Sequence, residues 1–235
     1  MITKRKLGIL LLIIFSGILY WNYTGSFFNN SSNLNEFIVE RVVDGDTIVL
    51  NNSLKVRLKG INTPEHGMSL DIAAGEFLRE LILNKSILLD NHGTDRYSRI
   101  LGYVFISGTN VNELILTNGF AHLYYYDKDN YYSSMEDAEL SARKKELGIW
   151  APSKNYGCLE LDEFIWLDEG EDDSERLVLK NSCESFNIII KDDATHIYER
   201  EIGDEITLET KDIWNDNGDS LYIWDEYGLV LFKRY

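Results

Sequence analysis

Three short segments of this sequence gather polar side chains that a folded core does not need. They are Asp44–Thr47, Arg57 together with Asn62–Glu65, and Thr94–Arg99. Carboxylate and carbonyl oxygens bind hard cations, arginine side chains neutralise a phosphate as its charge develops, and a carboxylate can deprotonate an attacking water. Together these residue types are the ones that metal-assisted hydrolysis of a phosphodiester requires.

The first two segments are predicted to lie at the ends of β-strands. Residues 37–52 hold two β-rich runs on either side of Asp44-Gly45, a dipeptide that marks a tight turn between strands. In the next run Leu54, Val56 and Leu58 alternate with charged residues, which places Arg57 on the face away from the core.

Further strands are predicted at residues 86–94 and 99–111, the second with a Ser-Gly turn. With the helices between and after them, the order along the chain is β-β-β-α-β-β-α-α. A short five-stranded sheet with interspersed helices fits an OB-fold barrel, an α+β arrangement.

Two of the helices carry specific expectations. Residues 73–83 place Ala73, Phe77 and Leu81 on one apolar stripe. Residues 133–150 form a strong helix in which Ser134 is placed to cap the N-terminus and basic residues come late, as the helix dipole favours.

Five blocks of residues 37–150 resemble the staphylococcal nuclease (thermonuclease) family, and they occur in the family's order. The blocks are VVDGDTI, VRLKGINTPE, DRYSRILGYVF, VNELILTNGFA and KKELGIW. One DGDT alone would be weak, whereas five ordered blocks are specific. The resemblance implies an OB-fold, secretion and a calcium-dependent nuclease activity on DNA or RNA.

The resemblance also implies a role for particular residues. Arg57 and Arg99 would bind the phosphate and stabilise the transition state, and Glu65 would be the general base that acts on water. Tyr97 and Tyr125 match positions that contact the bound nucleotide. On the residues alone, the two arginines could instead form salt bridges on the barrel surface, and Glu65 could brace its own loop.

The same resemblance implies a calcium site. Asp46, Asn62 and the carbonyl of Thr63 would ligate the ion, with Asp44 behind them. Asn62 stands where the family usually has aspartate. Because an amide oxygen ligates calcium without charge, we expect weakened metal affinity.

Two further departures affect the nucleotide pocket. Asp127 replaces a second tyrosine of the pocket, and Ser98 replaces a glycine of the third block. The predicted hydrolytic residues Arg57, Glu65 and Arg99 are all present.

Residues 158–235 differ in character from the preceding residues. About seven short β-runs separated by turn residues predict an antiparallel, all-β sandwich. The strand count and the block IWNDNGDSLYIWDEYGLVLFKRY resemble a lamin-tail domain, which is an immunoglobulin-like sandwich. This implies a binding or positioning module without catalytic residues, and we expect two domains, at 37–152 and 158–235.

The 235-residue chain has a formal net charge of −16, unevenly distributed. Residues 153–235 hold 8 basic and 22 acidic residues, a net charge of −14, whereas residues 36–152 carry −5. A field this negative works against nucleic-acid binding, so a nucleic-acid substrate requires a local basic patch, a metal or high salt.

The N-terminus reads as a targeting segment. Lys4–Lys6 precede an apolar run, and no charge occurs between Lys6 and Glu36. Residues 1–28 are therefore predicted to be an uncleaved membrane anchor or, alternatively, a cleaved signal peptide, with a polar linker at 29–36. Either places the rest of the chain outside the cytoplasm.

Cys158 and Cys183 are the two cysteines of the chain. In an extracytoplasmic protein such a pair suggests a disulfide, and two buried free thiols are the alternative.

The leading interpretation is an extracytoplasmic, calcium-dependent nuclease. The rival is a nucleic-acid or cell-surface binding protein whose barrel lost activity with Asn62. The retained Arg57, Glu65 and Arg99 favour the enzyme, because binding alone gives no reason to keep Glu65 facing a phosphate.

Overall fold

The computed structural model of the chain describes residues 34–125, 127–166, 175–215 and 218–235. Residues 36–235 form one compact unit. The predicted anchor at 1–28 lies outside the described residues, as does the linker up to residue 33. Within the described residues, no helix has the length and apolar character needed to cross a membrane.

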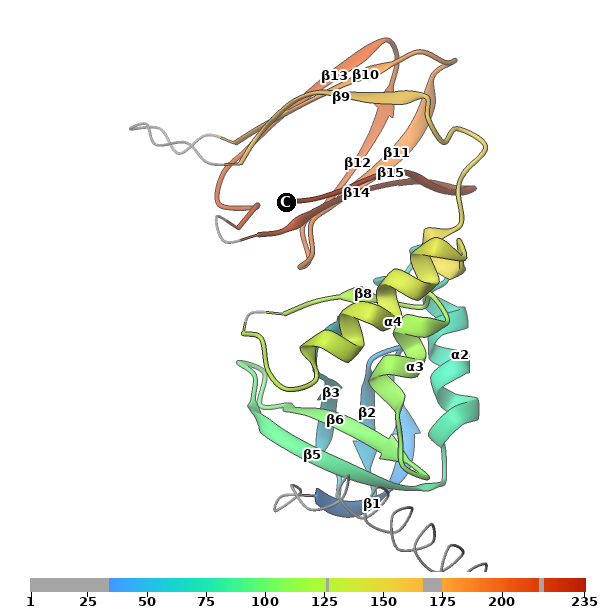
Figure 1. The fold of residues 1–235 in the computed structure, drawn as a ribbon, viewed down its shortest axis with the longest axis vertical. Helices are drawn as coiled ribbons and strands as arrows, with labels where there is room; N and C mark the ends of the chain where they lie inside the picture. The colour runs from blue at the N-terminus through green and yellow to red at the C-terminus, as the bar shows by residue number, and fades with distance from the viewer. Residues whose placement is uncertain (1–33, 126, 167–174, 216–217) are drawn as a thin grey trace, which may run out of the picture. The chain divides into compact units, whose positions relative to one another are not determined.

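Strands of the first half close into a barrel, as the sequence predicted. The main sheet has the order β3-β2-β1-β5-β6-β7, and a parallel pairing of β3 with β6 closes it (Figure 1). A short two-stranded pairing of β4 with β8 lies beside it. The strands are β1 (Leu34–Val42), β2 (Thr47–Leu50), β3 (Lys55–Leu58), β4 (Ile61–Asn62), β5 (Ser86–Thr94), β6 (Ile100–Ile106), β7 (Thr109–Asn110) and β8 (His122–Leu123).

Because β1 begins at Leu34, the last three residues of the predicted linker belong to the barrel instead. The predicted alternation of apolar and charged residues around Arg57 holds for Val56 and Leu58, which are fully buried. Leu54 precedes the strand and is 42% exposed, so the alternation begins later than predicted.

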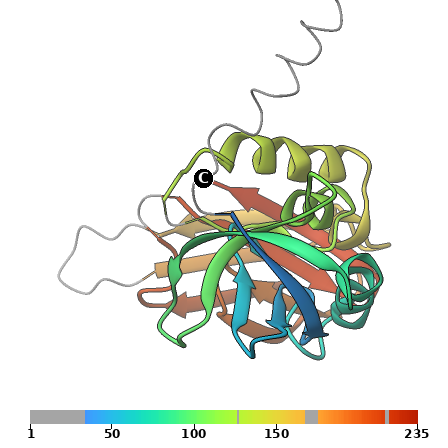
Figure 2. The same cartoon turned by 90° about the horizontal axis from the view of Figure 1, so that it is seen from below.

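The helices are α2 (Asp71–Ile82), α3 (Val111–Thr117), α4 (Tyr132–Lys144) and the 3-10 turn η1 (Gly148–Trp150). Helices α3 and α4 lie side by side against the barrel (Figure 1, Figure 2). The fully buried stripe of α2 is Ala74, Leu78 and Ile82, one position later than predicted, while Phe77 and Leu81 pack at its margin.

The predicted cap of α4 is wrong. The helix begins at Tyr132, and its N-cap, Tyr131, makes no side-chain cap hydrogen bond. Ser134 lies in the first turn, where its hydroxyl donates to the Tyr131 carbonyl and to Glu113.

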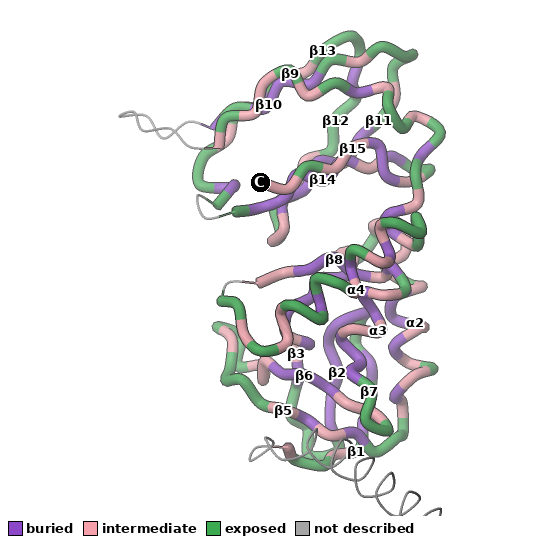
Figure 3. The backbone as a smooth tube through the Cα atoms, in the orientation of Figure 1, coloured by how far each residue is buried: buried purple, intermediate pink, exposed green. Residues whose placement is uncertain are grey.

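The second half of the described chain forms two antiparallel sheets, with the orders β13-β10-β9 and β12-β11-β14-β15. Leucines of the first sheet, among them Leu177 and Leu179, share a buried core with Ile190, Leu221 and Ile223 of the second (Figure 3). This shared core makes the pair a sandwich. The strands are β9 (Leu159–Ile165), β10 (Glu175–Asn181), β11 (Phe186–Lys191), β12 (Ile197–Ile202), β13 (Glu205–Thr210), β14 (Ser220–Asp225) and β15 (Gly228–Arg234).

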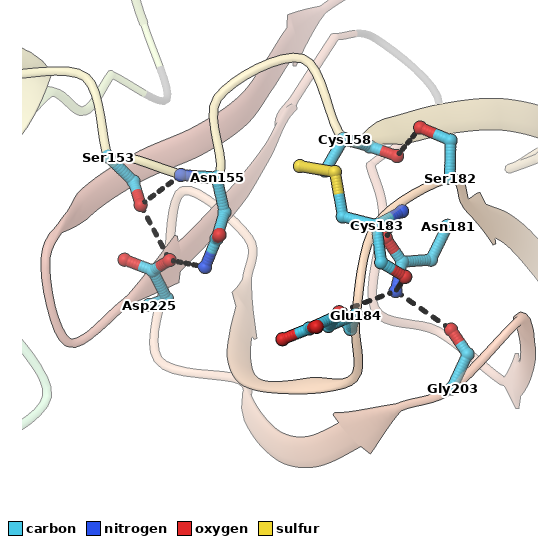
Figure 4. Close-up of a disulfide and its surroundings, with 9 residues drawn as sticks. All are labelled: Ser153, Asn155, Cys158, Asn181, Ser182, Cys183, Glu184, Gly203 and Asp225. Atoms are coloured by element: carbon cyan, nitrogen blue, oxygen red, sulfur yellow. Dashed lines mark hydrogen bonds between the residues drawn. A yellow bond between two sulfur atoms is a disulfide. The ribbon is translucent and has the colours of Figure 1, made fainter.

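A disulfide joins Cys158 to Cys183, as predicted. Figure 4 shows it next to Asn181, whose side-chain amide donates to the carbonyls of Cys183, Glu184 and Gly203. The bond therefore ties the start of β9 to the turn between β10 and β11.

The barrel and the sandwich pack against each other through a small apolar cluster. Ala142, Ile149 and Trp150 from the barrel side contact Tyr222 and Leu229 of the sandwich in one buried group. The backbone of the connecting segment also pairs with β15, since Ser153 and Leu229 share a hydrogen bond.

Candidate active site

Two arginines reach the same edge of the barrel because of the pairing of β3 with β6. Arg57 lies on β3, paired with Leu101 of β6, and Arg99 immediately precedes β6. Thr47 at the start of β2 is the antiparallel partner of Arg57, and its hydroxyl lies 3.5 Å from Nη1 of Arg99. Strand pairing alone therefore brings the two guanidinium groups to one place.

The Arg57 guanidinium is held by several partners and is 12% exposed. Its Nη1 donates to the carbonyls of Leu58 and Ile61, both at 2.8 Å. Its Nε lies 3.1 Å from Oδ1 of Asp46, and its Nη2 donates to Oδ1 of Asn62 at 2.9 Å. Four of its five N–H groups are therefore engaged, which fixes the guanidinium and leaves one Nη2 N–H for a phosphate oxygen.

Asp46 is buried and accepts from Thr47, which follows it, and from Thr63, which follows β4. Its Oδ1 accepts from the Thr47 hydroxyl at 3.0 Å, and its Oδ2 accepts from the Thr63 N–H at 3.1 Å and hydroxyl at 2.9 Å. A glycine is required next to it, because a Cβ on Gly45 would lie 2.7 Å from Cβ of Ala74. The turn thus packs directly onto helix α2.

Asp44 keeps an exposed surface but interacts closely with Asp46, whose N–H donates to it at 3.0 Å. Protein atoms packed around the Asp44 carboxyl raise its pKa, and the negative charge of Asp46 raises the pKa further. Both residues line one groove, which also contains Arg57 and Arg99.

Glu65 follows Pro64 and is half-buried. Among the described residues, none donates a hydrogen bond to its carboxylate, in contrast to Asp46. Burial lowers the pKa of Lys191 of the sandwich, and the negative charges of Asp192 and Glu65 oppose this lowering without reversing it. A carboxylate that keeps its lone pairs can accept a proton from water.

Asp95 holds Arg99 and the loop around it. Its Oδ2 accepts from Nε of Arg99 at 2.7 Å, and its Oδ1 accepts from the backbone N–H groups of Tyr97 and Arg99 at 2.9 Å. Burial opposes ionisation of Asp95, but these bonds outweigh it and hold the pKa below its usual range. Ser98, at φ 62°, adopts the left-handed conformation that glycine prefers.

The two predicted nucleotide tyrosines have different surroundings. Tyr97 is 65% exposed, with the guanidinium groups of Arg96 and Arg99 at 4.9 and 5.4 Å from its ring. Tyr125 is partly buried, and its hydroxyl lies 2.5 Å from that of Tyr103.

A polar network beneath Tyr125 was missed by sequence reasoning. Asp129 accepts from the Tyr103 hydroxyl at 2.8 Å and from Nζ of Lys59 at 2.7 Å. Burial would raise the pKa of Asp129, but these hydrogen bonds lower it overall. Only the fold brings Lys59, Tyr103 and Asp129 together, and no motif marks them.

One groove of about 930 Å³ contains all of the predicted site residues. They are Asp46, Arg57, Asn62, Thr63, Glu65, Tyr97, Arg99 and Tyr125. Ala194 and Thr195 of the sandwich also line the groove, and nothing in the sequence pointed to them. The structure therefore gathers the predicted set, while the role of each residue stays a prediction.

The groove is lined by both basic and acidic side chains. Lys59, Arg57, Arg79, Arg96 and Arg99 all line it. The acidic residues that line it are Asp44, Asp46, Glu65, Asp71, Glu76, Asp95 and Asp127. The lining is therefore not a basic patch, and with a net charge of −16 a polyanionic substrate would still require a metal or high salt.

The donor set at this groove fits a hard divalent cation. The carboxylates of Asp44 and Asp46 are the oxygen ligands that calcium prefers, and the Thr63 carbonyl, on the segment after β4, is the other predicted ligand at this groove. The described residues contain no cluster of three or more His, Cys, Asp or Glu side chains that could hold a metal. A cation here would therefore keep water ligands.

Comparison with known proteins identifies the family of the barrel. Residues 55–152 match the family described as Staphylococcal nuclease homologue. The chain is 31% identical over 164 residues to the Thermonuclease of Staphylococcus intermedius. The aligned region covers 63% of this chain and 98% of that protein. It is also 31% identical to the Micrococcal nuclease of Shigella flexneri, across 48% of this chain and 72% of that protein.

A third relative is much longer than the matched region. Endonuclease YhcR of Bacillus subtilis is 30% identical over 159 residues, which is 58% of this chain and 13% of that protein.

Proposed function

This chain belongs to the family of staphylococcal nuclease homologues and is a nuclease, and we propose that it cleaves DNA and RNA outside the cytoplasm in a calcium-dependent reaction. The observation that carries the proposal is the Glu65 carboxylate. It has no hydrogen-bond donor among the described residues, and it lines the same groove as Arg57 and Arg99.

In the proposed reaction Glu65 takes a proton from a water whose oxygen attacks phosphorus. The bond from phosphorus to the 5′ oxygen breaks, the leaving oxygen takes up a proton from solvent, and the products carry 3′-phosphate and 5′-hydroxyl ends. Arg57 and Arg99 bind the phosphate oxygens as negative charge develops on them. The fixed partners of both arginines support this role because they limit reorganisation during the step.

Calcium would be held by Asp46 and the Thr63 carbonyl, with Asp44 behind them, and Asn62 stays a predicted ligand. When bound, the ion would supply positive charge next to the scissile phosphate. The hydrogen bonds that the surrounding side chains make to these ligands determine which ligand oxygens remain free to bind the ion.

The exposed ring of Tyr97 is proposed to stack on a base of the substrate, and Tyr125 to contact the nucleotide. Arg96 and Arg99 beside the Tyr97 ring support this, since they place positive charge where the phosphate backbone would pass.

The extracytoplasmic location is supported by the Cys158–Cys183 disulfide, because such bonds persist in oxidising compartments. The basic and apolar N-terminal residues support membrane attachment or export. The sandwich is proposed to be a lamin-tail-like, immunoglobulin-like module, supported by its two sheets and shared core.

The test is a calcium titration of the full chain with single-stranded DNA and with RNA, followed by analysis of the product ends. The proposal expects cleavage that stops when calcium is chelated and returns when it is restored, with 3′-phosphate products. Undiminished cleavage in the chelator, or products with 5′-phosphate ends, would contradict it.

A further inference from the structure

Asn62 connects the catalytic groove to the sandwich. Its side-chain Nδ2 donates to the backbone carbonyls of Ala194 at 3.0 Å and Asp193 at 3.3 Å. Its Oδ1 accepts from Nη2 of Arg57 at 2.9 Å. Asn62 is 4% exposed, so each of these bonds is shielded from water.

The orientation of this amide follows from the chemistry of its partners. Backbone carbonyls only accept hydrogen bonds and a guanidinium only donates them, so the nitrogen must face the sandwich and the oxygen must face Arg57. An aspartate of the same shape would satisfy Arg57 but would place an oxygen against two carbonyl oxygens. The loop of the sandwich therefore accounts for asparagine at this position.

The loop that accepts these bonds, residues 192–195, is itself fixed. Nζ of Lys191 is buried and donates to the carbonyls of Asp192 and Ala194. The Asp193 N–H donates to Asp219 at 2.9 Å, and the Asp193 carboxylate accepts from the Tyr222 hydroxyl at 2.6 Å. The two carbonyls that meet Asn62 are thus presented by a braced backbone.

A second set of contacts ties the sandwich to the strand that carries Asn62. Arg234 donates to Glu139 of α4, at 3.1 Å from Nη2 to Oε1, and Glu139 also accepts from the Leu123 N–H at 2.8 Å. Strand β8, which contains Leu123, pairs with β4 through His122 and Asn62. Asn62 is therefore held directly and through β8.

We propose that Asn62 is a positioning residue through which the sandwich loop 192–195 fixes Arg57 in the groove. This inference rests on the proposed function, because it assumes that Arg57 binds the scissile phosphate. It makes the sandwich a structural part of the nuclease site, and Ala194 and Thr195 are its contribution to the groove wall.

Asn62→Asp in the full chain separates this inference from a ligand role for Asn62. Positioning predicts that kcat at saturating calcium falls by about tenfold or more, because an aspartate keeps its contact with Arg57 but is repelled by the two loop carbonyls, which displaces Arg57 from the reacting phosphate. It also predicts faster hydrogen exchange in peptides covering residues 191–196. A ligand role predicts a lower calcium requirement with kcat kept or raised.

Arg234→Gln breaks the second set of contacts without touching the groove. Arg234 also lies near the loop, with its Nη2 3.9 Å from Oδ1 of Asp193. Positioning therefore predicts that Arg234→Gln also lowers kcat, and that its effect and that of Asn62→Asp are not additive, because both loosen the same loop. Arg176→Gln is the matched control. Arg176 pairs with Glu163 and Glu209 on the other sheet of the sandwich, and its substitution should leave kcat unchanged.

The inference is overturned if Asn62→Asp keeps its kcat with unchanged exchange, or loses kcat without faster exchange at 191–196. It is also overturned if Arg234→Gln behaves like Arg176→Gln. Because exchange is measured without substrate, failure of the proposed reaction would leave this readout intact and would be recognised separately.

Discussion

Arg57 and Arg99 are built differently, although both reach the groove. Arg57 is 12% exposed and has partners on all three of its nitrogens, whereas Arg99 is 27% exposed and depends mainly on Asp95. The resemblance of their motifs to the nuclease family was sufficient to predict that both would meet, and the pairing of β3 with β6 is how the fold achieves it. It was not sufficient to predict the partners of Asn62, since these lie more than a hundred residues away.

Arg99→Lys is expected to lower kcat by about 10²–10³-fold, the usual effect of removing one donor to a developing oxyanion. A lysine cannot donate to Asp95 and to a phosphate in the geometry of a fork. Single-turnover cleavage of DNA measures this, with Arg41→Lys on the exposed face of β1 as the control. Equal rates for the two variants would contradict the account.

At the scale of elements, the strand order and the helix positions could be predicted, but details of helix ends and faces could not. The buried stripe of α2 is displaced by one residue because Ala74 must meet the turn at Gly45. Ser134 does not cap α4 because its hydroxyl has closer partners in Glu113 and the Tyr131 carbonyl. Both outcomes depend on tertiary contacts rather than on local preference.

The segment between β8 and α4 depends on Asp129, which accepts from Lys59, Tyr103 and the Tyr131 N–H. Asp129→Asn is expected to lower the free energy of unfolding by about 1.5–3 kcal/mol at neutral pH, the usual worth of hydrogen bonds to a charged group. Because the folded pKa of Asp129 is lowered, this stabilisation exists above the unfolded pKa of about 3.9 and is lost as pH falls through the folded pKa.

Urea unfolding of Asp129→Asn at neutral and acidic pH measures this dependence. Asp137→Asn, an exposed acid on α4, serves as the control. A difference between Asp129→Asn and the native chain that stayed constant down to the lowest pH would contradict the assignment.

At the scale of the whole molecule, the sandwich carries most of the negative charge, while the groove combines five basic side chains with seven acidic ones. The sequence indicated both halves and the strand count of the second. It gave no sign that the second half lines the groove, because Ala194 and Thr195 contribute through backbone position rather than through a recognisable side chain.

Replacing Cys158 and Cys183 together by serine is expected to lower the free energy of unfolding by about 3 kcal/mol in the chain-entropy model, given their separation of 25 residues. Denaturant unfolding of the double variant, compared with the oxidised native chain, measures this. Coincident unfolding curves would contradict the prediction, because they would show that the disulfide does not raise the free energy of unfolding.

The central claim is that Glu65 deprotonates the attacking water, and Glu65→Gln tests it most directly. The measurement is single-turnover cleavage of single-stranded DNA at saturating calcium, with DNA affinity measured in parallel and Glu80→Gln, an exposed glutamate on α2, as the control. The account predicts that Glu65→Gln lowers the rate by about 10²–10⁴-fold with DNA affinity retained, as removal of a general base does. A Glu65→Gln protein that cleaves as fast as the Glu80→Gln control would contradict it.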